Sequence, residues 1–150
     1  MSELTNLYQD VILDHAKRPR NFHPIPDADH HANGYNPLCG DKVTIYLTLV
    51  DDRITDISFQ GSGCAISTAS ASILTETLKG KTRKEAEALF EEFHGLVTGQ
   101  PVNASDGPPL GKLAVFSGVC EFPVRVKCAS LAWHTLKSAL EGRPSEASTE

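Results

Sequence analysis

The segment from residue 43 to residue 63 constrains the fold more than any other part of the chain. Apolar side chains alternate with polar ones from Val43 to Val50, which is the pattern of a strand with one buried face. Asp51-Asp52 predicts a tight turn, and Arg53–Gln60 predicts a returning strand that ends at Gly61-Ser62-Gly63. Together these segments predict an antiparallel hairpin.

Segments with helical periodicity surround this hairpin. Thr82 followed by Glu85 is a capping-box pattern, and His30–Tyr35 predicts a short edge strand. Helices are expected at Leu4–Lys17, Cys64–Leu78, Thr82 to Phe93 or Val97, Leu110–Val119, and Pro123 to about Glu141. This order predicts an α+β fold, in which helices pack on one face of a small three-stranded antiparallel sheet.

Length and charge narrow the class of protein. The 150 residues fit a single domain over residues 1–150, with a polar, frayed tail from about residue 142. The net charge of −5 argues against a nucleic-acid binder, which normally carries a basic face. No apolar run is long enough to span a bilayer, and the acidic segment Met1–Asp10 lacks the apolar core of a signal peptide. We therefore expect a cytoplasmic protein with no membrane or nucleic-acid partner.

The turn Cys39-Gly40-Asp41 places a thiol and a carboxyl group two residues apart, directly before the hairpin. Cysteines in the cytoplasm are more often metal ligands or redox groups than disulfides. Cys64 and Cys128 each lie near the start of an expected helix, where the helix dipole favours an anion. The pattern predicts one metal site at one end of the sheet, with four donors: Cys39, Asp41, Cys64 and Cys128. Thiolates select zinc, Cu(I) or an iron–sulfur cluster, and a carboxylate can complete a zinc shell.

Each donor also has a simpler interpretation. A free cysteine is usually a small, buried apolar residue, and Cys120, which lies outside the pattern, is interpreted in that way. Asp41 alone would more often be a turn residue, and His30 and His31 are interpreted as solvated edge residues. No two cysteines form a Cys-x-x-Cys pair, so their spacing alone leaves both interpretations open.

Four sequence blocks follow one another in an order that is typical of a known family. They are Leu7–Asn21 (Leu-Tyr-x-x-Val-Ile-x-Asp-His-x-x-x-Pro-Arg-Asn), Asn36–Asp41 (Asn-Pro-x-Cys-Gly-Asp), Gly61–Ser70 (Gly-x-Gly-Cys-Ala-Ile-Ser-x-Ala-Ser) and Arg125–Trp133 (Arg-Val-Lys-Cys-Ala-x-Leu-x-Trp). The blocks resemble the U-type iron–sulfur assembly proteins, which form the IscU and NifU N-terminal family. The resemblance covers nearly the whole chain.

Within that family the chain is more similar to the SufU branch. IscU proteins carry a histidine directly before the last ligand cysteine, and Lys127 stands at that position here. The stretch Ser117–Arg125 lacks the Leu-Pro-Pro-Val-Lys segment that a dedicated chaperone reads in IscU. The spacer between Cys64 and Cys128 is also longer than in IscU, with added material between about residues 94 and 116.

The resemblance implies a zinc-dependent sulfur acceptor for a pyridoxal-phosphate cysteine desulfurase. Cys39 would take the sulfur, Arg125 would position the site or the partner, and zinc would be held by four residues: Cys39, Asp41, Cys64 and Cys128. One alternative is a scaffold that builds a [2Fe–2S] cluster, or binds iron, at the same site and passes it to downstream assembly or apo-acceptor proteins. Another alternative is a structural zinc module that only binds a partner. The first two make the chain a sulfur carrier or scaffold rather than an independent enzyme.

Overall fold

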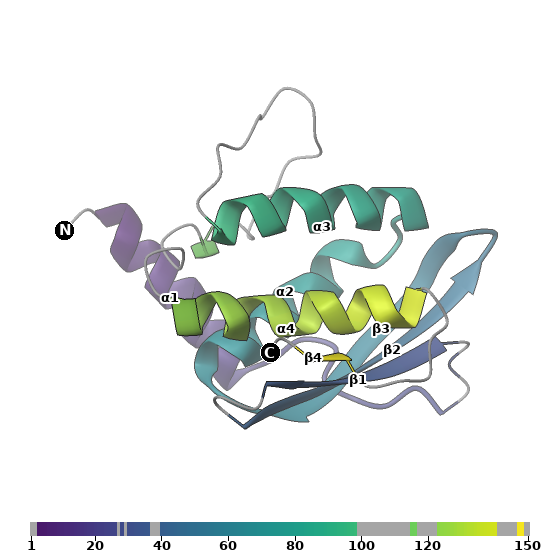
Figure 1. The fold of residues 1–150 in the computed structure, drawn as a ribbon, viewed down its shortest axis with the longest axis horizontal. Helices are drawn as coiled ribbons and strands as arrows, with labels where there is room; N and C mark the ends of the chain where they lie inside the picture. The colour runs from purple at the N-terminus through teal and green to yellow at the C-terminus, as the bar shows by residue number, and fades with distance from the viewer. Residues whose placement is uncertain are drawn as a thin grey trace.

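The computed structural model describes residues 3–26, 28, 30–36, 40–98, 115–116, 123–140 and 147–148. The elements follow in the order α1 (Glu3–Lys17), β1 (His30–Asn36), β2 (Asp41–Val50), β3 (Arg53–Ser62), α2 (Ala65–Leu78), α3 (Arg83–Val97), α4 (Pro123–Leu140) and β4 (Ala147–Ser148) (Figure 1). This order confirms the expected α+β fold.

The predicted hairpin is the centre of the sheet. β2 pairs antiparallel with β3 on one side and with β1 on the other, which confirms the three-stranded antiparallel sheet. Asp51 and Asp52 form the turn with φ values of 52° and 63°, the left-handed conformation that fits the twist of a two-residue hairpin. β4 adds two residues parallel to β1, so the full strand order is β3-β2-β1-β4.

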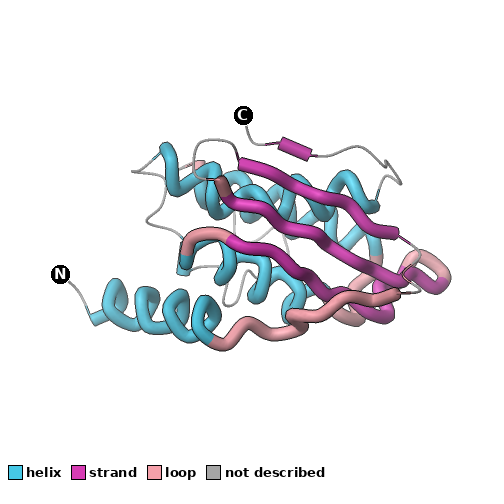
Figure 2. The backbone as a smooth tube through the Cα atoms, turned by 90° about the horizontal axis from the view of Figure 1, so that it is seen from below, coloured by secondary structure: helices cyan, strands magenta, loops and turns pink. Residues whose placement is uncertain are grey.

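The helices cover one face of the sheet. Seen from below, the strands lie in front of the helices, and the segment after α1 runs along the outer edge of β3 (Figure 2). There Phe59 N donates a hydrogen bond to Asn21 O at 3.0 Å. The buried core lies between the two layers and includes Ile45, Leu47, Ile57, Phe59, Leu74, Leu89, Phe93 and Trp133. The alternation of β2 is thus explained, because its apolar side chains point toward the helices.

Helix α2 lies at the centre of the helical layer and packs against both α1 and α4. Its small side chains allow this close contact: Ala69, Ser70 and Ala71 are all buried. Ser70 Oγ donates a hydrogen bond of 2.6 Å to Ala129 O on α4. A bulkier residue at Ser70 would push α4 away from α2.

Several boundaries differ from the sequence-based expectation, and β2 begins at Asp41, two residues earlier than expected. β3 continues through Ser62, because Gly61 and Ser62 pair with Val43 and Lys42 and so extend the ladder. Of the helix expected at Leu110–Val119, residues 115–116 form a short 3₁₀ turn, and the remainder lies outside the described residues, as does Cys120. Among the helices that the structure describes, none has both the length and the apolar character needed to cross a membrane.

Candidate metal centre

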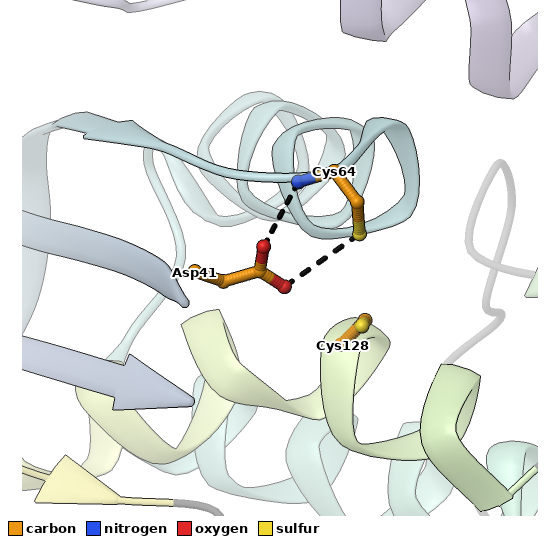
Figure 3. A group of neighbouring side chains, drawn as sticks. All are labelled: Asp41, Cys64 and Cys128. Atoms are coloured by element: carbon orange, nitrogen blue, oxygen red, sulfur yellow. Dashed lines mark hydrogen bonds between the residues drawn. The ribbon is translucent and has the colours of Figure 1, made fainter. Parts of the chain in front are cut away.

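Three of the four predicted donors meet at one end of the sheet. Asp41 begins β2, Cys64 directly precedes α2, and Cys128 lies on α4. Their side chains turn toward one another (Figure 3), and one potential ligand atom from each lies within 4.8 Å of the other two. Asp41 and Cys128 are buried, whereas Cys64 reaches solvent. Donors from three separate elements therefore surround a single point.

The carboxylate of Asp41 is held by Cys64. Its Oδ1 accepts a hydrogen bond of 2.9 Å from Cys64 N, and its Oδ2 lies 3.6 Å from Cys64 Sγ. Gly63 makes this approach possible, since a Cβ on Gly63 would lie only 2.6 Å from Asp41 Oδ1. The second glycine of the Gly-x-Gly-Cys block is thus required because Gly63 packs directly against the carboxylate of Asp41.

Cys64 is the N-cap residue of α2, which confirms its expected place at a helix start. Its backbone is extended (φ −71°, ψ 168°), and its Sγ accepts a hydrogen bond of 3.4 Å from Ser67 N. A cap thiol in this position receives the backbone N–H that a serine or aspartate cap would normally receive. The thiol of Cys64 therefore takes part in capping α2 as well as lining the candidate centre.

The structure places Cys128 in the expected helix, but too far from the first turn for the helix dipole to act on it as the sequence analysis expected. Helix α4 begins at Pro123, so Cys128 falls in its second turn, where the first-turn N–H groups are no longer available. The nearby donor is instead the side chain of Asn36, whose Nδ2 lies 3.8 Å from Cys128 Sγ. Of the flanking basic residues, Arg125 is exposed and Lys127 is half-buried.

Cys39 lies outside the described residues, together with Pro37 and Leu38. On either side of these residues, Gly40 N donates a hydrogen bond of 2.8 Å to Asn36 O. Gly40 has a φ of +74°, a conformation that glycine adopts without strain. Cys39 directly precedes Gly40 in the sequence and stands two residues before the donor Asp41.

The donor set suits a soft or borderline metal ion. Two cysteines and one aspartate share a partly enclosed space, and two N–H groups already point at the sulfur atoms. A tetrahedral zinc site places sulfur ligands about 2.3 Å from the ion, so its donors lie roughly 4 Å from one another, close to the spacing here. These residues fit a zinc ion or an iron–sulfur cluster, and a fourth donor would complete the shell.

His30 and His31 are not part of the candidate centre. His30 pairs with Leu47, at the end of β1 opposite to Asn36, and His31 is exposed and stacks on Tyr46 with ring centroids 6.4 Å apart. His31 fits the interpretation as a solvated residue, whereas His30 is half-buried. The expected edge strand is also corrected, because β4 pairs with β1 on its outer side. Sequence reasoning missed Asn36 and Gly63 as parts of the centre, although both stand inside the blocks that carry the family resemblance.

Comparison with known proteins gives consistent matches over the chain. A family model described as the NifU-like N-terminal domain matches residues 7–142. The iron–sulfur cluster assembly scaffold protein IscU of Streptococcus pyogenes serotype M1 is 41% identical over 141 residues, which cover 94% of this chain and 87% of that protein. The zinc-dependent sulfurtransferase SufU of Bacillus subtilis strain 168 is 37% identical over 139 residues, with coverage of 93% and 92%.

A solved structure agrees with these relatives. The crystal structure of a candidate iron–sulfur cluster assembly scaffold protein for the SUF system, from Fervidobacterium islandicum AW-1, superimposes with a TM-score of 0.80 at 35% identity. The match covers 93% of this chain and 96% of that chain. The similarity therefore extends from the sequence blocks to the whole fold.

Proposed function

Because this chain belongs to the NifU-like N-terminal domain family, we propose that it accepts persulfide sulfur from a cysteine desulfurase for iron–sulfur cluster assembly. The observation that carries the proposal is the convergence of Asp41, Cys64 and Cys128 on one point, and Cys39 stands two residues before Asp41 in the sequence. The name of the Bacillus subtilis relative supports zinc dependence and sulfur transfer. The working unit is the single domain of residues 1–150.

Sulfur transfer is a thiol exchange at Cys39. The Cys39 thiolate attacks the outer sulfur of the desulfurase persulfide and forms a new S–S bond to it. The S–S bond of the donor breaks, and its electron pair leaves on the desulfurase cysteine as a thiolate. Cys39 is then the persulfide, and the exchange needs no external oxidant or reductant. The sulfur passes next to a cluster-assembly protein or an apo-acceptor.

The remaining donors would hold the metal. Asp41, Cys64 and Cys128 are fixed by β2, α2 and α4, whereas Cys39 precedes β2 in the sequence. A bound zinc ion supplies positive charge that keeps the cysteines as thiolates at neutral pH. A carboxylate is a harder donor than a thiolate, so Asp41 keeps this shell more exchangeable than four cysteines would. Arg125, exposed one turn before Cys128, is placed to contact an approaching partner.

A second function uses the same residues. The Streptococcus pyogenes relative is named a cluster assembly scaffold, and the four donors suit a [2Fe–2S] cluster as well as zinc. Lys127 favours sulfur transfer over this scaffold role, because the histidine that IscU proteins carry at this position is absent. Iron and zinc compete for the same thiolates, so both functions use the same site. Experiments on sulfur transfer and cluster formation, rather than the structure, distinguish them.

The test measures turnover of a cysteine desulfurase with and without the zinc-loaded protein. We expect the protein to raise the rate and Cys39→Ala to abolish the increase. Cys120→Ala is the matched control, since it removes a cysteine outside the donor set, and it should stimulate as well as wild type. Equal stimulation by Cys39→Ala and wild type would refute the transfer role.

The same samples separate the alternatives. A scaffold would form a coloured cluster on the protein and deliver it intact to an apo-acceptor, whether or not it stimulates the desulfurase. A structural zinc module would bind one zinc per chain, and Cys39→Ala would keep every partner interaction. Elemental analysis of the freshly purified protein tests the centre itself, which is expected to hold about one zinc or iron per chain.

A further inference from the structure

Asn36 contacts the candidate centre without offering it a ligand of its own. We propose that Asn36 is a positioning residue that sets the metal affinity of the site through an N–H···S hydrogen bond to Cys128. This inference rests on the metal centre of the proposed function. It concerns a side chain that has no place in the sulfur-transfer step.

Asn36 links three parts of the centre. It is the last residue of β1, and its Cα pairs with that of Asp41, the first residue of β2. Its backbone oxygen accepts the hydrogen bond from Gly40 N. Its side-chain Nδ2 reaches Cys128, which lies 92 residues later in the chain. One residue therefore connects Gly40, Asp41 and the helix α4 thiol.

The side chain of Asn36 is fully buried, with an exposed fraction of 0%. A buried amide is costly unless its polar atoms find partners, and an apolar residue would fill the same space without that cost. The partner of Nδ2 is a sulfur atom, at a distance of 3.8 Å that suits the larger radius of sulfur. The buried amide of Asn36 therefore donates a hydrogen bond to the sulfur of a candidate metal ligand, Cys128.

The two described thiols are supported in parallel ways. Ser67 N donates to Cys64 at the start of α2, and Asn36 Nδ2 donates to Cys128 in the second turn of α4. The donor to Cys64 is a backbone N–H in the first turn of a helix. The donor to Cys128, which lies in the second turn of α4, is a side-chain N–H. Both bonds draw negative charge from sulfur, which offsets the excess negative charge of three thiolates and one carboxylate around a divalent ion.

The consequence is a measurable change in metal binding. Removal of an outer hydrogen-bond partner of a metal ligand typically weakens metal binding by about ten- to a hundredfold. Asn36→Leu removes the donor with little change in side-chain shape, and it keeps the backbone oxygen that binds Gly40. We expect it to raise the dissociation constants for Zn²⁺ and Co²⁺ by about that factor. The loss of the hydrogen bond should also move the sulfur-to-cobalt charge-transfer band to lower energy.

Asn33→Leu is the matched control. Asn33 lies on the same strand, but its side chain is exposed and accepts a hydrogen bond from Thr44 Oγ1 at 2.7 Å. This variant should leave both the cobalt spectrum and the dissociation constants unchanged. If wild type binds neither Zn²⁺ nor Co²⁺, the proposed function itself fails. If wild type binds and Asn36→Leu binds equally with an unmoved band, only the role of Asn36 is overturned.

A measurement on the unmodified protein covers the case in which Asn36→Leu does not fold. Loading wild type with ¹¹³Cd²⁺ should shift one side-chain amide proton of Asn36 downfield, because the N–H···S bond strengthens when the sulfur is held as a thiolate. The side-chain amide protons of Asn33 should not move. Unmoved Asn36 resonances in a cadmium-loaded protein would overturn the proposal.

Discussion

Gly63 lies against the carboxylate of Asp41, in a place that has no room for a side chain. The missing Cβ of Gly63 leaves the space that the Asp41 carboxylate occupies, and a methyl group there would lie 2.6 Å from Oδ1 and 2.9 Å from Cγ. Asp41 would have to move away from Cys64, breaking the hydrogen bond from Cys64 N. Gly63 is thus a positioning residue for Asp41.

Gly63→Ala should therefore weaken zinc binding at least tenfold and lower the free energy of unfolding by about 1–3 kcal/mol, since an overpacked site must shift. Competition with a chromogenic chelator measures the first effect, and urea unfolding measures the second. Gly80→Ala is the control, because Gly80 has a φ of +87° but open space around the missing Cβ. It should cost about 1 kcal/mol of stability and leave zinc affinity unchanged. Wild-type zinc affinity in Gly63→Ala would contradict the steric role.

His134 belongs to α4, and its ring packs against Phe90 of α3 with ring centroids 5.6 Å apart. Burial lowers the pKa of His134 below its ordinary value of 6.5, and His94 and Lys137 lower it further by repelling the charged form. The unfolded chain therefore binds a proton more readily than the folded protein. Above pH 6.5 His134 is neutral in both states, so the difference in proton binding does not affect the free energy of unfolding. The free energy of unfolding decreases as the pH falls through 6.5 toward the pKa of His134 in the folded protein.

His134→Gln should flatten this part of the stability profile. Urea unfolding at pH 5.5 and 7.5 gives the pH-dependent loss, and the loss should be smaller in the variant by about a few tenths of a kcal/mol, since the half-buried ring is partly screened by solvent. Taking the difference between the two proteins cancels the titration of the metal donors. His23→Gln removes an exposed histidine away from α3 and α4 and should not flatten the profile. An identical pH-dependent loss in His134→Gln and wild type would refute the assignment.

At the scale of elements, α2 is joined to α1 by a buried polar contact. Ser72 Oγ on α2 lies 2.7 Å from Nδ1 of the buried His15, and it accepts a hydrogen bond of 2.9 Å from Arg20 N. Arg20 in turn forms an ion pair with Asp14 at 2.7 Å, which holds the pKa of that carboxyl below its usual value. The hydroxyl of Ser72 thus connects the end of α1 and the segment after it to α2, the helix that Cys64 caps.

Ser72→Ala should lower the free energy of unfolding by about 1–3 kcal/mol, because it leaves buried polar atoms of two segments without this partner. Thr77→Ala, on the same helix at a half-buried position, is the control and should change stability by less than about 0.5 kcal/mol. Chemical denaturation of both variants measures the difference. Equal stability of Ser72→Ala and wild type would show that the contact contributes nothing.

The elements themselves follow from short-range patterns in the sequence. The alternation in β2, the two turn aspartates and the capping box of Thr82 and Glu85 all appear where they are expected, because each depends on neighbouring residues. The contacts of the centre are different. Asn36 and Cys128 meet across 92 residues, and no local periodicity encodes that distance. The start of α4 at Pro123, in contrast, agrees with the expectation, and it places Cys128 in the second turn of that helix.

At the scale of the whole molecule, the candidate centre and the hydrophobic core stabilise different things. The core joins the sheet to the helical layer through residues such as Ile45, Phe59 and Trp133. Among the described residues, the centre joins the ends of β1, β2 and α2 to the second turn of α4. A bound ion would therefore add stability to a fold that its core already holds together, unlike a small zinc finger, which unfolds without its metal.

Removal of the metal should accordingly lower the melting temperature without unfolding the protein at 25 °C. At a free zinc concentration a thousandfold above the dissociation constant, binding contributes about 4 kcal/mol. In a domain of this size that corresponds to a shift of roughly 8–16 °C. Circular dichroism with and without a strong chelator measures both the melting temperature and the helix content. Cys64→Ser is the control, because loss of a donor should make its melting temperature insensitive to the chelator. Loss of the helical signal at 25 °C on chelation would mean that the core alone does not hold the fold, and an unchanged melting temperature in wild type would mean that no stabilising ion is bound.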